Sequence, residues 1–239
     1  IYQGKVTDAD YLGQNRTDMF SYSKSHADKG FLFDIGGAVG YVIPLMPSWN
    51  IIPISGYSYH KQKLSLIGGE LIVDIFRPVS DKTGALSDLN SRYTAKWYGP
   101  YAGTLFTGYL FGVYFTFGYW YQTLIYRAEG YWNLHKEFIG NFKHSGSGGS
   151  GHTMEVTLNY PVSACFSIGC ALKKQDLKVT SGKDSTIFEE EGEIYNSAGK
   201  LNHARSKSYS LIMTLSYIFD MDFTQKRGRI RDKLRRSYG

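Results

Sequence analysis

Apolar and polar side chains alternate with a period of two through most of this chain. The clearest example begins at residue 31, and its apolar face comprises Phe31, Phe33, Ile35, Val39 and Tyr41. The same alternation recurs over residues 113–121, 154–160, 166–172 and 209–219. Because successive side chains of a strand point to opposite faces, each segment is predicted to be a β-strand with one apolar face.

The connections between these segments alternate in length. Short turns that contain proline are predicted at residues 44–47 and 160–162, and long polar connections at residues 77–91, 136–151 and 179–206. Short turns at one end and long loops at the other are typical of outer-membrane barrels. We therefore predict an all-β, antiparallel transmembrane β-barrel over residues 1–219. The run SGSGGSG at residues 145–151 is predicted to be a flexible loop, with an inserted linker as the alternative.

Composition alone leaves two classes of β protein open. The chain has 42% hydrophobic residues and a mean hydropathy of −0.30, which suits a soluble protein but also a barrel that is apolar only on its outer face. Its 20 Tyr, 14 Phe and 4 Trp suit the aromatic girdles of a barrel, or an aromatic-rich soluble sandwich. No apolar run reaches the roughly 18–20 residues of a transmembrane helix. An export signal, if there is one, is expected upstream of Ile1.

Charge and cysteine content narrow the possible functions. Of the net charge of +6, much lies in residues 220–239, which hold seven basic and three acidic residues. We predict a solvated basic tail there, with contact to anionic lipid headgroups as the alternative. The nearly neutral body does not favour nucleic-acid binding. Cys165 and Cys170 lie five residues apart and would point to opposite faces of a strand, so we expect packing residues and no disulfide between them.

Two pairs of polar residues are candidates for chemistry. Asp8 and Asp10 are spaced i and i+2 at a strand end and so share one face. Close carboxylates repel each other, so one of them retains a proton and the pair can hold or activate a water molecule. Asn133 and His135 have the same spacing, and a histidine beside an amide can be a positioned general base. Each pair taken alone is also consistent with a strand end that has no chemical role. No pair of residues has the spacing expected of metal ligands.

In the order of these features the sequence resembles the omptins, outer-membrane proteases with a ten-stranded barrel. The landmarks run from about Lys5 to Phe219: Asp8 and Asp10, the strand from Phe31, Gly56-Tyr57, Gly99–Tyr101, the strand from Tyr114 towards His135, and the closing Phe219. About seven to eight of the ten strands have a counterpart here. The resemblance therefore implies that the chain lacks the first strands of the family fold.

The resemblance also implies a site. In omptins an Asp pair faces an Asp–His pair across the external mouth, and the water between them attacks the peptide carbonyl. Asp8 and Asp10 would be the acidic pair and His135 the base, with Asn133 at the position where the family has a carboxylate. An amide can hydrogen-bond the imidazole but cannot stabilise imidazolium, so this hypothesis predicts higher activity for Asn133→Asp.

The resemblance further implies lipopolysaccharide as an activating lipid, with Lys61 and Lys63 as one possible contact, and no other cofactor. Tyr131 aligns with an acid that in the family helps to select a basic residue before the scissile bond, so a preference for Arg or Lys is not implied.

Three functions remain open from the sequence. The first is an omptin-like endopeptidase in the outer membrane of a Gram-negative-type bacterium, a monomer acting on proteins or peptides at the exterior. The second is a barrel of the same fold that binds a partner, as an adhesin or receptor, which Asn133 and Tyr131 would suit. The third is a passive pore, which a barrel of about ten strands favours least because its lumen is narrow.

Overall fold

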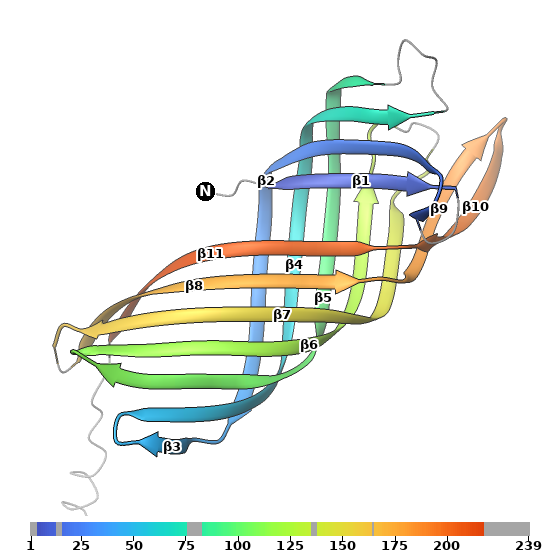
Figure 1. The fold of residues 1–239 in the computed structure, drawn as a ribbon. Coiled ribbons are helices and arrows are strands. Elements are labelled where there is room, and N and C mark those ends of the chain that lie inside the picture. Colours follow the sequence, from blue (N-terminus) through green and yellow to red (C-terminus); the bar gives the residue numbers. More distant parts are fainter. Residues whose placement is uncertain (1–3, 13–15, 76–82, 135–137, 164, 218–239) are drawn as a thin grey trace, which may run out of the picture.

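The computed structural model describes residues 4–12, 16–75, 83–134, 138–163 and 165–217. Within these ranges, antiparallel strands form one eleven-stranded sheet (Figure 1). The strands are β1 (Lys5–Tyr11), β2 (Met19–Gly40), β3 (Ile43–Met46), β4 (Trp49–Asp74), β5 (Gly84–Leu110), β6 (Val113–Tyr131), β7 (Phe142–Pro161), β8 (Phe166–Val179), β9 (Gly182–Glu190), β10 (Glu193–Leu201) and β11 (Ala204–Tyr217). In this part of the chain, no helix is long and apolar enough to cross a membrane.

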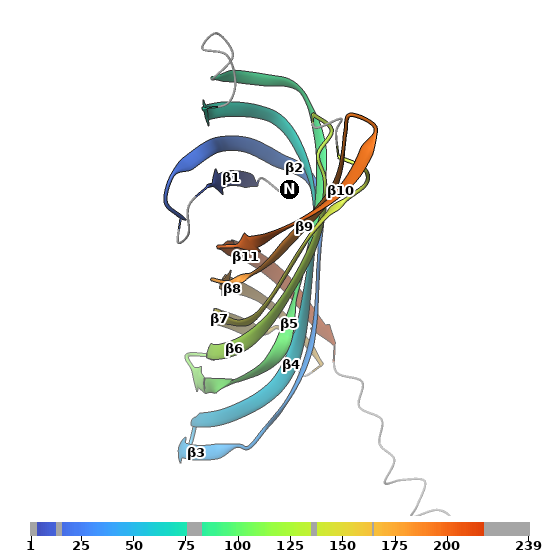
Figure 2. The same cartoon turned by 90° about the vertical axis from the view of Figure 1, so that its right-hand side faces the viewer.

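The sheet has a simple meander order. Its strands pair in the sequence β1-β2-β4-β5-β6-β7-β8-β11, while β3 pairs with β4 and the β9–β10 hairpin pairs with β7. Seen from the side, the sheet curves into a trough (Figure 2). The antiparallel all-β prediction is confirmed, and the eight strands of the main order agree with the seven to eight expected. The last predicted residue of the closing strand, Phe219, and the basic tail lie outside the described residues.

The apolar faces of the strands point outward and are exposed. Large apolar side chains on this surface include Phe31, Phe33, Ile35, Val39, Tyr121, Leu158, Leu172, Leu211, Met213 and Leu215. In water, each exposed apolar Å² costs about 25 cal/mol relative to burial, so a soluble sandwich would cover such a face. An outward apolar belt is instead what a lipid-facing wall requires.

Above this belt the inner face holds two small apolar clusters. One is built from Ala95, Trp97, Leu124, Tyr126, Ala128, Leu177 and Val179, and the other from Ala27, Leu64, Leu66 and Leu89. Tyr93 packs against both of them. These clusters fix the long strands where they extend beyond the belt. We call the inner side of this region, with β1 and the start of β9, the mouth.

The structure contradicts one predicted loop. The glycine-rich run of residues 145–151 lies inside β7. A Cβ atom on Gly146 or Gly149 would come within 2.6 and 2.5 Å of the Val179 side chain, so glycine allows β7 to lie against its neighbours. Gly148 has φ +71° and lies where the β6–β7 register shifts. The glycines therefore form a β-bulge and a close-packed strand, and neither a flexible loop nor a linker.

Two other predicted loops are partly strand. Residues 84–91 begin β5, and residues 182–201 form the β9–β10 hairpin. Every residue of β10 except Leu201 is exposed, so polar residues are tolerated on both faces of this strand. Its sequence therefore lacks the alternation of apolar and polar residues that predicts a strand. The two short turns lie further along the chain than predicted. Residues 43–46 form β3, and its hairpin with β4 turns at residues 47–48. The second turn follows the end of β7 at Pro161, where the backbone N–H groups of Val162 and Ser163 donate to the Phe166 carbonyl. Cys165 and Cys170 are free thiols.

Candidate functional site

Asp8 and Asp10, the Asp pair, lie on the inner face of β1. β1 pairs with β2, so that Asp8 is opposite Ser23 and Asp10 opposite Ser21. Val6 has the same parity on the strand and packs against the inner apolar cluster of Ala27 and its neighbours. The Asp pair therefore faces into the mouth, on one face as the i and i+2 spacing predicts.

The mouth holds the pKa of Asp10 far above its ordinary value. The pKa is raised from 3.8 to about 7, first because the surrounding protein displaces water from the carboxylate. Repulsion from Asp8, Asp184 and Asp74 raises it further, and His144 lowers it. Asp10 is itself an exposed residue, but the surrounding protein and the neighbouring carboxylates still disfavour its charged form. Near neutral pH the Asp pair thus retains a proton.

A chain of hydrogen-bonding groups from four strands lies in the same mouth. The Tyr93 hydroxyl on β5 makes a short hydrogen bond with the Tyr126 hydroxyl on β6 and lies 2.9 Å from Nδ1 of His144 on β7. His144 Nε2 lies 3.3 Å from Oδ1 of Asp184 on β9, its partner in the β7–β9 register. Burial raises the pKa of Tyr126 to about 12 and that of Tyr93 well above its usual value. Both phenols are therefore neutral hydroxyls at physiological pH.

Asn133 makes its side-chain contacts elsewhere. Its Oδ1 accepts hydrogen bonds from the Asn90 backbone N–H (2.8 Å) and the Ser91 hydroxyl (2.9 Å), and its Nδ2 donates to the Asp88 carbonyl (2.7 Å). All three partners belong to β5, so the amide ties the end of β6 to the start of β5. His135, the predicted base, lies outside the described residues.

The outer surface beside Asn133 is basic. A depression of about 500 Å³ there is lined by Lys63, Asn90, Arg92, Thr94, Glu129, Tyr131, Asn133 and Asn141. Just below it the strand register places Lys61 opposite Lys96, and Lys96 opposite Arg127. Lys61 is also opposite Phe33 of the apolar belt. Lys61 and Lys63, the predicted lipid contacts, thus lie on the outward face at the upper edge of this belt.

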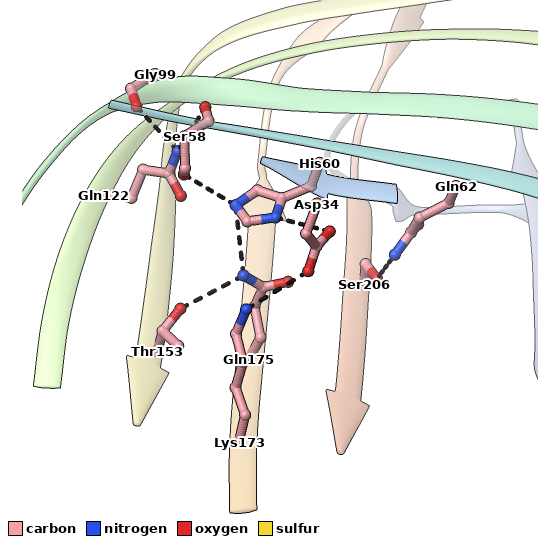
Figure 3. A network of polar contacts seen from close by, with 10 residues as sticks. All are labelled: Asp34, Ser58, His60, Gln62, Gly99, Gln122, Thr153, Lys173, Gln175 and Ser206. Carbon is pink, nitrogen blue, oxygen red and sulfur yellow. Dashed lines mark hydrogen bonds and ion pairs between the residues drawn. The ribbon is translucent and has the colours of Figure 1, made fainter. Parts of the chain in front are cut away.

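A polar network whose centre is buried lies on the inner face at the depth of the belt (Figure 3). His60 Nε2 lies 2.9 Å from the Ser58 hydroxyl, and His60 Nδ1 lies 3.0 Å from Asp34 Oδ1. Lys173 of β8 reaches the same carboxylate at 3.5 Å. The network continues through the side chains of Gln62, Gln122, Thr153, Gln175 and Ser206. It joins strands from β2 to β11 through the interior, which disfavours a passive pore.

The contacts from Ser58 to His60 to Asp34 resemble those of a serine-nucleophile catalytic triad, but the surroundings of these residues indicate a structural role. Ser58 is 6% and His60 5% exposed, and Gln175 also approaches His60 Nε2, at 3.4 Å. A triad serine needs space for an acyl group and donors for an oxyanion. The buried side chains around Ser58 occupy that space. We assign this network to the stability of the barrel interior.

Ser58→Ala should therefore change stability modestly and leave any hydrolytic activity intact. Removal of one buried hydroxyl hydrogen bond is expected to cost about 1 kcal/mol, because Gln175 remains beside His60 Nε2. Urea unfolding in detergent micelles measures the cost. Loss of activity in a variant that still folds, or covalent labelling of Ser58 by a fluorophosphonate, would contradict the structural role.

Sequence reasoning passed over His144, Asp184 and Tyr93. His144 has no polar residue two positions before or after it, which is the spacing that singled out the other pairs. Its partners are distant in the sequence: Tyr93 lies 51 residues before it and Asp184 lies 40 residues after it. In the part of the chain that the structure describes, no group of three or more His, Cys, Asp or Glu side chains is arranged to hold a metal ion.

Comparison with known proteins places the fold and its family. The structure is similar to the crystal structure of the outer membrane protease OmpT from Escherichia coli, with a TM-score of 0.64 and 13% sequence identity over 90% of this chain and 74% of that one. At this identity the likeness concerns the fold, an omptin-like outer-membrane β-barrel. No curated protein matches the chain. Residues 1–219 match the family described as Pom, Protochlamydia outer membrane protein. The chain belongs to this family of outer-membrane proteins.

Proposed function

We propose that this protein is an endopeptidase of the outer membrane whose site lies at the external mouth of the barrel. The observation that carries the proposal is the Asp pair on the inner face of β1, which retains a proton near neutral pH and has a histidine and a third carboxylate within electrostatic reach. Paired carboxylates with separated protonation states are a common means of holding and activating a water molecule.

The proposed reaction is direct hydrolysis. The Asp pair holds a water molecule, whose oxygen forms a bond to the peptide carbonyl carbon while the carbonyl π electrons move to oxygen. A histidine base accepts the proton of the water and returns it to the leaving amine as the C–N bond breaks. The resemblance to omptins proposes His135, with Asn133 beside it, for this base. The substrates are proteins or peptides that reach the mouth of a monomeric barrel.

Cleavage of a quenched fluorescent peptide library by the refolded protein, with lipopolysaccharide present, tests the function. Cleavage that is absent from the refolded Asp10→Asn variant would support it. A parent that resists heat-induced unfolding on gels, as folded barrels do, yet cleaves no peptide would reject it. Peptide capture without cleavage would favour the second candidate, a surface binding protein, which the engagement of the Asn133 side chain by β5 supports.

We also propose lipopolysaccharide as a lipid partner at the outer basic surface. Lys61, Lys96 and Arg127 form a row across three strands at the edge of the apolar belt, where lipid phosphates lie. Each cation near an anionic membrane surface contributes about 1 kcal/mol. Phosphate groups of the lipid would be the chemistry recognised there.

Lys61→Ala with Lys96→Ala should weaken binding to vesicles that contain lipopolysaccharide by about 10-fold or more. The weakening should diminish at high salt, since screening already removes much of the attraction. Lys200→Ala, on the exposed hairpin strand β10, is the matched control and should bind as the parent does. Equal binding by the double variant and the control would exclude the row as a lipid site.

A further inference from the structure

We propose that the proton acceptor of this mouth is a relay from the Tyr93 hydroxyl through His144 to Asp184, so that His144 replaces His135 as the base. This inference rests on the proposed endopeptidase function. It differs from the arrangement implied by the omptin resemblance in every residue except the Asp pair, and each of its members comes from a different strand.

One hydrogen bond and one ion-pair contact link the three residues of the relay. The Tyr93 oxygen lies 2.9 Å from His144 Nδ1, and His144 Nε2 lies 3.3 Å from Asp184 Oδ1. The rings of Tyr93 and Phe142 flank the imidazole, with centroids 5.9 and 5.1 Å away, and hold its plane. The His144 side chain is 18% exposed and that of Asp184 is 42% exposed, so the chain runs from the packed wall to the open mouth.

These contacts assign the tautomer of His144. No hydrogen bond joins His144 Nε2 to Asp184 Oδ1, but the carboxylate 3.3 Å away attracts an N–H group, so we assign the hydrogen of the imidazole to Nε2. Nδ1 is then an acceptor and takes the hydrogen of the Tyr93 hydroxyl. The phenol oxygen has two lone pairs, and the Tyr126 hydroxyl donates to one of them. The other is available to a water molecule in the mouth.

The relay and the Asp pair act on each other electrostatically. Asp184 and His144 both shift the titration of Asp10, and Asp8 disfavours the ionised form of Tyr93. Val6, on the same face of β1 as the Asp pair, and Tyr93 both pack against the apolar cluster of Ala27, so β1 and the relay line the same region of the mouth. Asn133, by contrast, directs its side-chain amide at β5.

The proposed step balances without a cofactor. The water held by the Asp pair forms its O–C bond to the peptide carbonyl and transfers one proton to the Tyr93 oxygen. The Tyr93 proton passes at the same time to His144 Nδ1. The high pKa of Tyr93 disfavours a free phenolate, so the two transfers occur together. Asp184 stabilises the imidazolium. When the intermediate collapses and the C–N bond breaks, the Tyr93 hydroxyl gives one proton to the leaving amine and takes one back from His144 Nδ1, so the relay returns to its starting state.

The experiment compares steady-state cleavage by the refolded full-length protein and by Tyr93→Phe, His144→Gln and Asp184→Asn. Tyr93→Phe and His144→Gln should each lower kcat by at least about 100-fold with KM nearly unchanged, because proton transfer and not binding is lost. A proton inventory in mixed H₂O and D₂O should be curved for the parent, since two protons move together. A mainly structural role of these residues would not produce that curvature.

The chain provides a matched control. The Tyr119 hydroxyl on β6 lies 2.9 Å from Nδ1 of His152, which is on β7 like His144, but both side chains are exposed on the outer face. Tyr119→Phe and His152→Gln remove a tyrosine–histidine hydrogen bond of the same length away from the mouth. Both variants should keep the kcat and the proton inventory of the parent.

The outcomes separate the relay from the proposed function. Large kcat losses in Tyr93→Phe and His144→Gln, with active controls, would establish the relay. Unchanged kcat in both, while Asp10→Asn is inactive, would overturn the relay and leave the endopeptidase function standing. A folded parent that cleaves nothing would overturn the function, and the relay as its base along with it.

Discussion

Asp10→Asn should lower kcat for peptide cleavage by about 10²–10⁴-fold, the range expected when a group that transfers or holds a proton is removed. The asparagine amide has the shape of the carboxyl group but cannot share a proton with Asp8. The water molecule would then lose one of its two carboxylate contacts. KM should change little, because the Asp pair acts on the water and not on the side chains of the substrate.

Asp18→Asn is the control for this substitution. Asp18 lies in the connection between β1 and β2 and has φ +55°, a conformation that asparagine also adopts readily. The exchange is therefore chemically identical and leaves the backbone unstrained. Equal losses in both variants would indicate a general effect of charge or folding, and would remove Asp10 from the proposed mechanism.

The same Asp10→Asn variant should be more stable than the parent at pH 8 and equally stable at pH 4. The pKa of Asp10 is raised in the folded protein from 3.8 to about 7, so between these values the folded state binds more protons than the unfolded state. Stability of the parent therefore falls as pH rises from about 4 through about 7. Urea unfolding at both pH values would measure the difference and show that loss of activity is not loss of fold.

Much of the wall could be predicted because lipid imposes a strong pattern. A lipid-facing strand must place an apolar side chain at every second position, and the segment from Phe31 to Val39 does so on its exposed face. The pattern weakens above the belt, where water contacts the outer face and polar residues such as Lys61 and Arg127 become acceptable. The start of β5 and the β9–β10 hairpin, which lie in that region, were therefore not predicted as strands.

The histidine of the mouth was hidden by one bulge. Met154 is exposed on the outer face of β7, and strict alternation from Met154 back to residue 144 would place His144 on that face too. The bulge at Gly148 inserts one extra residue and turns His144 inward, while His152 stays outward. A one-residue shift reverses every side chain beyond it, and local sequence does not reveal which glycine of the run carries the bulge.

The partners of His144 depend on longer-range pairing. Asp184 reaches it because the β9–β10 hairpin folds back to pair with β7, and Tyr93 because β5 and β7 both flank β6. The Asp pair needed no such information, since its spacing on one strand already puts both carboxylates on one face. Residues that share a face of one strand can thus be predicted from the sequence. Contacts between residues of different strands can be predicted only when the register of the strands is known.

Asn133→Asp should lower stability by about 1–3 kcal/mol and leave cleavage no higher than in the parent. The carboxylate would keep the two hydrogen bonds that Asn133 Oδ1 accepts from Asn90 and Ser91. It would lose the bond from Nδ2 to the Asp88 carbonyl and place an oxygen against that acceptor, which costs the desolvation of an unpaired group. The penalty should be largest above pH 5, where the new carboxyl is ionised.

This variant decides between the two possible bases of the mouth. If an Asn133–His135 pair activates the water, a carboxylate at position 133 supplies the missing charge for imidazolium, and kcat should rise well above that of the parent. If Tyr93, His144 and Asp184 carry the proton, His144 already has its carboxylate, and the exchange acts only on the β5 contact. The two variants Asn133→Asp and Asp184→Asn should be measured side by side. A higher kcat in Asn133→Asp with an unchanged kcat in Asp184→Asn would assign the base to His135. An unchanged kcat in Asn133→Asp with a lower kcat in Asp184→Asn would assign it to His144.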